Sequence, residues 1–276
     1  MTNSGSKTIV IYSDIHDGST TAVCSPEPEI EEQSTTYKPN ALQKELYSIW
    51  EEAIDDYSKK KPDLCVVNGE PVDGGNPKQL GNQSWSTNLY DQAVDSCKLL
   101  KMTKAKEFLF TRGSGYHVQI HGTPIEQFVA DRMKGVKYSI YKGMKPKNAD
   151  FYANVRAFDT NISFTHHIGY AKFFAYRATP ISKEAALMAL DKGRNMKYDI
   201  IVRSHVHYFM MVKSAHTIGF TTPAWKYPDG HLYRGGLGGT FPDIGMVELI
   251  IEPNNEVIVN EHITELRIKP EVYEVK

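Results

Sequence analysis

Short apolar runs alternate with segments of helical periodicity in the first half of the chain. Residues 7–13, 64–67 and 107–111 are apolar runs typical of buried strands. Between them, residues 41–59 and 89–105 carry apolar side chains three or four positions apart, which is the pattern of an amphipathic helix. Because strands that alternate with helices build a parallel sheet, this half predicts an α/β arrangement.

The second half of the chain is richer in strands. We expect strands at residues 137–141, 151–158, 161–165 and 199–203. Residues 182–195 predict a helix that is capped by Ser182. From Tyr208 onward the pattern is one of short strands and turns, and no repeat or linker interrupts the sequence. We therefore expect one domain over residues 1–276, with two packed sheets, helices outside them and a strand-rich part from about residue 208.

The composition is that of a globular protein. Apolar residues make up 41% and charged residues 24% of the 276 positions, and no apolar run approaches the ~20 residues that span a bilayer. The polar N-terminus leads straight into a strand, which predicts no secretory signal. Three scattered cysteines argue against a disulfide framework and fit a cytoplasmic location. The net charge of −1 gives no sign of the broad basic surface that duplex nucleic acid selects.

Metal-binding side chains follow five of the apolar runs. They lie in segments 14–16 (Asp-Ile-His), 69–73 (Gly-Glu-Pro-Val-Asp), 113–117 (Gly-Ser-Gly-Tyr-His), 166–167 (His-His) and 205–207 (His-Val-His). Six of the ten histidines fall in these segments. Because imidazole and carboxylate are common metal ligands, the pattern indicates a metal centre at one edge of a sheet. A metal-dependent hydrolase is the leading hypothesis.

Taken singly, each segment has a simpler explanation. Asp14 also fits a strand cap or a turn, and a pair of histidines also fits hydrogen-bonded residues on a strand. Residues two apart in an extended segment point to the same side, so Asp14 and His16 are expected to reach one ion. Adjacent residues point to opposite sides, so only one of His166 and His167 is expected to bind. The clustering of the segments favours ligation.

The order of these segments resembles that of a known family. Calcineurin-like metallophosphoesterases carry Asp-x-His, Gly-Asp-x-x-Asp, Gly-Asn-His, His and Gly-His-x-His in this order, and residues 8–208 follow a similar series. The chain is most similar to divergent versions of bacteriophage type. The resemblance implies an α/β fold, namely a four-layer α/β/β/α sandwich of two mixed β-sheets flanked by helices. It also implies two divalent metal ions at one sheet edge.

Matched residue by residue, the resemblance implies roles for the segments. The implied metal ligands are Asp14, His16 and His207 for the first ion, His166 and His205 for the second, and Glu70 as the bridge between them. His117 matches the histidine beside the scissile phosphate, and Asp73 matches the second acid of its motif, so both are expected to be catalytic. Outside the motifs, Arg112 and Arg177 are candidates for binding phosphate oxygens, with a surface ion pair as the alternative for each.

Two departures from the family pattern leave alternatives open. Glu70 is one methylene longer than the usual bridging Asp, so Asp73 is an alternative ligand. In the third segment the usual Asn ligand is absent. Ser114 or a water is then expected to take its place, or His117 to become a ligand instead of an acid. The second metal is accordingly expected to bind more weakly.

We expect a phosphoesterase that acts through a metal-activated water, first of all a phosphodiesterase or nuclease. The mixed ligands favour Mn, with Fe or Zn as alternatives. The alternative functions are a phosphomonoesterase for nucleotides or proteins and a degenerate, non-catalytic binding module. The expected partner is a phosphate ester such as a nucleotide or single-stranded nucleic acid, met in the cytoplasm, or in the host cytoplasm for a phage-encoded protein. Trp225, Tyr227 and Tyr233 fit either stacking on a base or a role in the core or a turn.

Overall fold

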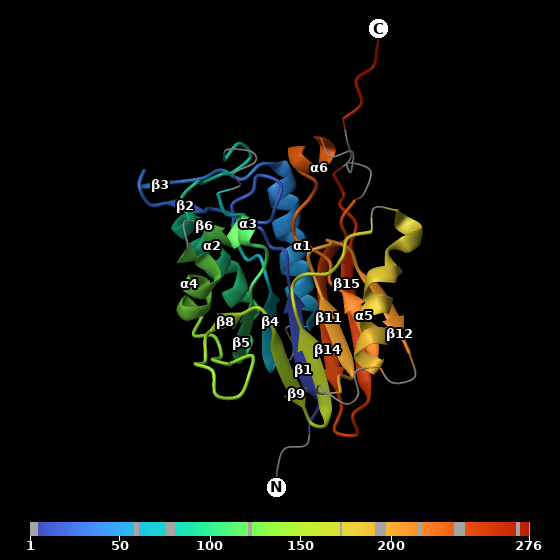
Figure 1. Ribbon diagram of the computed structural model, residues 1–276. Coiled ribbons are helices and arrows are strands. Elements are labelled where there is room, and N and C mark those ends of the chain that lie inside the picture. The colour runs from blue at the N-terminus through green and yellow to red at the C-terminus, as the bar shows by residue number, and fades with distance from the viewer. Residues whose placement is uncertain are drawn as a thin grey trace.

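Two β-sheets pack face to face in the computed structural model, with helices on both outer sides (Figure 1). The structure describes residues 5–57, 61–75, 81–120, 123–171, 173–190, 197–214, 217–234, 241–268 and 271–275.

The first sheet has the strand order β15-β14-β1-β4-β5-β8. Its strands are β1 (Lys7–Tyr12), β4 (Leu64–Asn68), β5 (Glu107–Thr111), β8 (Ala149–Asp150), β14 (Ile244–Ile251) and β15 (Val257–Thr264). Strands β1, β4, β5 and β8 run parallel, as the alternating pattern predicts. Strands β14 and β15 add antiparallel pairings beside β1, so the sheet is mixed.

The second sheet has the order β12-β13-β11-β10-β9. Its strands are β9 (Ala153–Ala157), β10 (Thr160–Phe164), β11 (Ile200–Arg203), β12 (Met210–Lys213) and β13 (Ile218–Thr221). The three central strands β10, β11 and β13 are parallel, and an antiparallel strand closes each edge. Both sheets therefore present the carboxyl ends of several parallel strands.

Helices cover the outer face of each sheet. The longer ones are α1 (Ala41–Tyr57), α2 (Leu89–Met102) and α4 (Ile125–Arg132) on the first sheet, and α5 (Ala178–Leu190) on the second. Shorter elements lie in the loops: α3 (Gly115–Val118), η1 (Phe174–Tyr176), α6 (Gly230–Arg234), and the strand pairs β2 (Glu29–Ile30) with β3 (Thr35–Thr36) and β6 (Gln119–Ile120) with β7 (Thr123–Pro124).

The alternation of side chains along the central strands explains the layers. In β1, Val10 and Tyr12 belong to the core under α1 and α2, whereas Ile9 and Ile11 belong to the core between the sheets. In β11, Ile201 packs in the separate core under α5. Since strand side chains point alternately to opposite faces, each sheet buries apolar residues on both sides. The predicted four-layer α/β/β/α sandwich is confirmed.

Two sequence-based expectations about secondary structure are wrong, and a third is confirmed with shorter bounds. Residues 137–141 form no strand, and Tyr138 makes only an isolated bridge with Lys147. The strand expected at 151–158 is present as the shorter β9, which the chain enters after leaving the first sheet at β8. The helix expected from Ser182 begins at Ala178, and the Ser182 hydroxyl donates back to the carbonyl of Ala178 within the helix. The predicted end of this helix, residues 191–195, lies outside the described residues.

Two side-chain predictions have clear outcomes in the core. Cys65 is fully buried in β4, and Cys24 and Cys97 are buried free thiols as well. Trp225 is also fully buried, with its ring 4.6 Å from that of Trp50. Stacking of Trp225 on a substrate base is therefore excluded, and its alternative role in the core holds. Among the described residues, no helix combines the length and hydropathy needed to cross a bilayer.

Candidate metal centre

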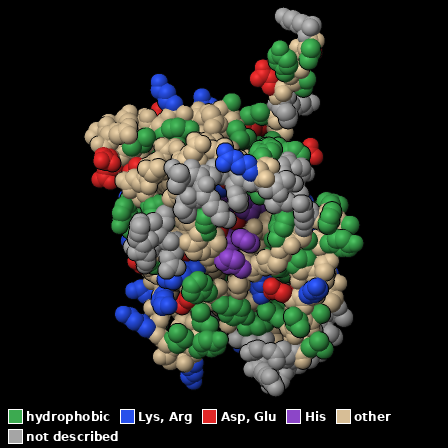
Figure 2. Space-filling model, turned by 45° about the horizontal axis from the view of Figure 1, so that its top comes forward, with side chains coloured by type: hydrophobic (Ala, Val, Ile, Leu, Met, Phe, Trp, Pro, Cys, Tyr) green, Lys and Arg blue, Asp and Glu red, His purple; other side chains and the backbone are tan. Residues whose placement is uncertain are grey.

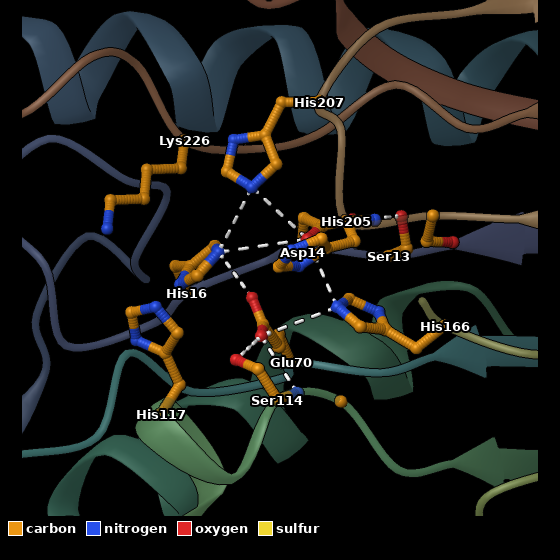
Figure 3. A network of polar contacts seen from close by, with 12 residues as sticks. Ser13, Asp14, His16, Glu70, Ser114, His117, His166, His205, His207 and Lys226 are labelled. Carbon is orange, nitrogen blue, oxygen red and sulfur yellow. Dashed lines mark hydrogen bonds and ion pairs between the residues drawn. The ribbon is translucent and has the colours of Figure 1, made fainter. Parts of the chain in front are cut away.

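The metal-binding segments converge at the carboxyl ends of strands from both sheets. Figure 3 shows their side chains pointing toward one another from separate loops. The loops follow β1 (Asp14, His16), β4 (Glu70, Asp73), β5 (Ser114, His117), β10 (His166) and β11 (His205, His207). Residues that are far apart in the sequence therefore lie together at the predicted sheet edge.

Five of these residues have left-handed backbone conformations. Their φ angles are 48° at Asp14, 51° at His16, 54° at Glu70, 74° at His205 and 58° at His207. Such a conformation costs a non-glycine residue roughly 1–2 kcal/mol. The expectation that Asp14 and His16 reach one ion from an extended segment is thus wrong about the backbone. Their side chains nevertheless converge. Strained backbone concentrated at one site is a known mark of functional sites.

Two glycines allow the loops to approach closely. A Cβ atom on Gly69, where φ is +85°, would lie 2.3 Å from Nδ1 of His166. A Cβ on Gly113 would lie 2.4 Å from Cγ of Glu70. Both glycines therefore leave the space that the neighbouring side chains occupy.

The first group of possible ligands consists of Asp14, His16, Glu70 and His207, whose donor atoms all lie within 4.8 Å of one another. His16 Nε2 is 2.8 Å from Glu70 Oε2 and 3.4 Å from His207 Nε2. His207 Nε2 is 3.2 Å from Asp14 Oδ1. Two carboxylates and two imidazoles thus face one small volume.

The second group consists of Glu70, His166 and His205. His166 Nε2 lies 3.4 Å from Glu70 Oε1 and 3.8 Å from Asp14 Oδ1. The two groups share Glu70, which presents Oε2 toward His16 and Oε1 toward His166. The neighbouring His167 is exposed, whereas His166 is fully buried. Of the adjacent pair, His166 is therefore the residue that faces the cluster.

Two buried atoms indicate that this donor set fits a cation. Among the described residues, Asp14 Oδ1 and His166 Nε2 form no hydrogen bond of good geometry, and their polar neighbours His207 and Glu70 are themselves candidate ligands. Leaving a buried polar atom without a partner costs about 1–3 kcal/mol. A cation between the two groups would satisfy both atoms, and the mixed oxygen and nitrogen donors suit a divalent transition metal.

The imidazoles and carboxylates shift one another's pKa values. Burial alone raises the pKa of Asp14 and of Glu70, but nearby histidines, His166 first among them, lower both values overall. Burial lowers the pKa of His166, yet Glu70 and Asp14 raise it to about 10. His166 is therefore protonated at neutral pH until a cation displaces its proton.

A third group, His16, Asp73 and His117, lies beside the first. Asp73 Oδ1 is 3.0 Å from Nδ1 of His16 and 2.8 Å from Nζ of Lys226. Lys226 also contacts Asp229 at 3.1 Å. Burial lowers the pKa of Lys226, but Asp73 and Asp229 raise it overall, so the ammonium stays charged. The role of Lys226 could not be predicted from the sequence, because a lysine between two aromatic residues carries no signal of burial.

His117 lies in the short helix α3. Its Nδ1 atom is 2.7 Å from the carbonyl oxygen of Asp73 and 3.6 Å from the Asp73 carboxylate. Burial lowers the pKa of His117 to about 4, so the ring is neutral at neutral pH. If His117 protonates a leaving group, it has first to gain that proton.

Ser114 and Glu126 hold Glu70 in place. The Ser114 hydroxyl and its N–H, the latter at 3.0 Å, both donate to Glu70 Oε1. The buried Glu126 accepts from the N–H groups of Gly113 and Glu70. Burial raises the pKa of Glu126 to about 7. Glu126 was not predicted, since an acid inside an amphipathic helix is ordinarily a surface residue.

The two predicted phosphate-binding arginines differ in position. Arg177 lines the cavity over the metal ligands, with its guanidinium carbon 4.5 Å from the ring centre of Tyr208. Arg112 is not among the lining residues, and its guanidinium lies over the ring of Phe151. Phosphate binding by Arg112 stays a prediction.

The cavity has a volume of about 380 Å³. Its lining includes metal-facing residues from all three groups, among them His16, Glu70, His117, His205 and His207. Figure 2 shows histidine side chains in a hollow near the centre of the corresponding face. The candidate ligands that line the cavity are therefore open to a small molecule, whereas Asp14 and His166 lie behind them.

No protein-family profile and no curated protein matches the sequence. Solved structures that resemble the chain include an archaeal phosphodiesterase, with 12% identity and a TM-score of 0.44 over 92% of this chain and 99% of that chain. Vps29 from Entamoeba histolytica in complex with Zn²⁺ has 9% identity and a TM-score of 0.45 over 93% of this chain and 98% of that chain. A putative 5′-nucleotidase from Staphylococcus aureus has 11% identity and a TM-score of 0.46 over 98% of this chain and 56% of that chain. At these identities and TM-scores, the structural similarity says nothing about the activity of this chain. None of these structures supports the bacteriophage-type assignment.

Proposed function

We propose that the chain is a metal-dependent phosphoesterase. The observation that carries the proposal is the position of Glu70, whose carboxylate belongs to two separate groups of possible metal ligands. A shared carboxylate can hold two cations close enough together to act on one phosphate. The residues that would hold the cations are Asp14, His16 and His207 for the first, His166 and His205 for the second, and Glu70 for both.

Bound divalent cations, for which we propose Mn with Fe or Zn as alternatives, supply charge that polarises a phosphoryl group and activates a water. The residues around the ligands set their orientation. Asp73 accepts from Nδ1 of His16, and the carbonyl of Asn68 accepts from Nδ1 of His166 at 2.7 Å. Both contacts leave Nε2 as the atom that faces a cation. Asp73 is thus a positioning residue for His16.

Two further residues are proposed to meet the substrate. Arg177 lines the cavity and presents a guanidinium for the non-bridging phosphate oxygens. His117 also lines the cavity and is proposed to lie beside the leaving oxygen. Because Ser114 is engaged with Glu70, its proposed role is to fix the bridge rather than to serve as a fourth ligand of the second cation.

Hydrolysis of a phosphodiester is the finer function that we propose, and a simple pair of substrates tests it. Metal-free protein is reconstituted with Mn and assayed on bis-p-nitrophenyl and p-nitrophenyl phosphate. We expect Mn-dependent turnover that favours the diester and falls roughly a hundredfold or more in Asp14→Asn and His205→Ala. Faster turnover of the monoester would favour a phosphomonoesterase. Mn binding without turnover of either substrate would favour a non-catalytic binding module.

A further inference from the structure

The cavity over the candidate metal centre is lined by two chemically different sets of residues. One set contains the polar residues described above. The other set is apolar or aromatic and consists of Tyr116, Tyr170, Val206, Tyr208, Leu232, Phe241 and Pro242. A phosphoryl group held by cations gains nothing from apolar neighbours. The apolar set therefore indicates where the organic part of a phosphate ester lies.

Two of the aromatic lining residues keep much of their surface exposed. Tyr170 is 44% exposed and Phe241 is 52% exposed. Tyr170 follows the candidate ligand His166 by four residues. Phe241 lies two residues before Asp243, whose N–H donates to the carbonyl of His207 at 2.9 Å. Both rings are therefore tied to segments that also carry metal-facing histidines, and both are available to pack against a planar group.

Arg177 adds a cation to this aromatic lining. Its side chain is only 9% exposed, and its guanidinium carbon lies 4.5 Å from the ring centre of Tyr208 and 5.2 Å from that of Phe174. Its Nε atom has no hydrogen-bond partner in the part of the chain that the structure describes. A buried guanidinium that is held between two rings and lacks a partner for one donor is prepared for an anionic ligand.

The size of the cavity and the charge of the chain limit the ligand. A volume of about 380 Å³ falls within the roughly 300–1,000 Å³ of small-molecule sites. The net charge of −1 gives no broad basic surface along which a long nucleic acid would run. The site thus combines a phosphate-binding centre with an aromatic lining of small-molecule size.

We propose, on the basis of the phosphoesterase function above, that the ligand is a small nucleotide and that the substrate is first of all a dinucleotide with a phosphodiester bond. Its base packs against Tyr170 and Phe241, and its phosphate reaches the candidate metal centre. Arg177 contacts a phosphate oxygen from the aromatic side of the cavity.

Matched ligands that differ only in the base test this proposal. The Mn-loaded protein is assayed on AMP against ribose 5-phosphate, and on the dinucleotide ApA against an abasic dinucleotide of the same backbone. Binding of the same four ligands is measured by calorimetry. We expect the base to raise kcat/KM, or the binding constant where turnover is absent, by roughly tenfold or more. Equal values with and without the base would overturn the proposal.

Variants locate the base within the cavity. Tyr170→Ala and Phe241→Ala are expected to lower the preference for the ligand with the base at least severalfold. The matched control is Phe173→Ala, because Phe173 is 67% exposed and is not among the lining residues. A base preference that survives both lining variants, or falls equally in the control, would overturn the assignment of these two rings.

Two other outcomes separate the base-binding site from the phosphoesterase function. If no substrate is hydrolysed but AMP binds at least tenfold more tightly than ribose 5-phosphate, the phosphoesterase function fails and the base site stands. If single-stranded oligonucleotides are cleaved internally with a higher kcat/KM than ApA, the limit to small nucleotides is overturned.

Discussion

Lys226 and Asp73 form a buried ion pair, with 2.8 Å between Nζ and Oδ1. Lys226 is 4% exposed and Asp73 is 1% exposed. The same carboxylate oxygen lies 3.0 Å from Nδ1 of His16. The pair therefore connects the loop after β13 with a candidate ligand that follows β1. Through Asp73, the charge of Lys226 sets the orientation of His16.

Replacing Lys226 with Met is expected to destabilise the protein and weaken metal binding together. Removing one partner of a buried ion pair costs about 3–5 kcal/mol of unfolding free energy. Loss of the contact that orients a ligating histidine costs roughly 10–100-fold in metal affinity. Urea denaturation and calorimetric titration with Mn measure the two effects.

The control for Lys226→Met is Lys106→Met. Lys106 pairs with Asp63 at the surface, where its side chain is 59% exposed. An exposed pair contributes at most about 1 kcal/mol. Equal losses of stability and Mn affinity in both variants would contradict the role that we assign to Lys226.

Gly69→Ala is expected to displace His166. The added Cβ would lie 2.3 Å from Nδ1 of His166, in addition to the strain at a φ of +85°. Gly143→Ala is a matched control, because Gly143 has a φ of +91° but no atom within 4 Å of the added Cβ. Both variants carry backbone strain of roughly 1–2 kcal/mol. Only Gly69→Ala should also lose bound Mn, as measured by elemental analysis, and equal Mn content in the two variants would argue against the close packing at His166.

Glu126 should make the stability of the metal-free protein depend on pH. Burial raises its pKa from 4.5 to about 7, so the folded state holds the proton more tightly than the unfolded state. The contribution is fully present below pH 4.5 and is lost as pH rises through 7. This difference corresponds to about 3 kcal/mol.

The pH effect is measured by urea denaturation of the wild type and of Glu126→Gln at several pH values. The wild type should lose stability relative to the variant between pH 4.5 and 7. Glu32→Gln, an exposed substitution, serves as the control. Parallel curves for the wild type and Glu126→Gln would mean that Glu126 does not titrate in this window.

His166 and His167 should differ in their effect on metal content. His166 is fully buried and faces Glu70 and Asp14, whereas His167 is exposed beside the ring of His205. His166→Gln is expected to lose one of two bound Mn ions, and His167→Gln to keep both. Loss of Mn in His167→Gln alone would exchange the roles of the two residues.

The strands and the edge at which the site lies could be predicted because they are local properties. An apolar run of four to seven residues identifies a buried strand, and the polar residues directly after it lie at the end of that strand. The geometry at that end could not be predicted in the same way. Asp14 and His16 adopt left-handed conformations that depend on the packing of the loops against each other.

The supporting residues could not be predicted because their partners are distant in the sequence. Lys226 lies 153 positions from Asp73, and Glu126 lies 56 positions from Glu70. Tyr138 illustrates the opposite case. It has the pattern of a strand residue, but its hydroxyl donates to the carbonyl of Phe110, so it serves as a contact between segments instead of a member of a sheet.

The position of Glu70 between two cations is the central claim, and anomalous X-ray scattering from crystals grown with Mn tests it most directly. The expected result is two Mn peaks in the cluster, both contacted by Glu70. Asp14, His16 and His207 should surround one peak, and His166 and His205 the other. No peak, a single peak, or two peaks of which Glu70 contacts neither would contradict the claim.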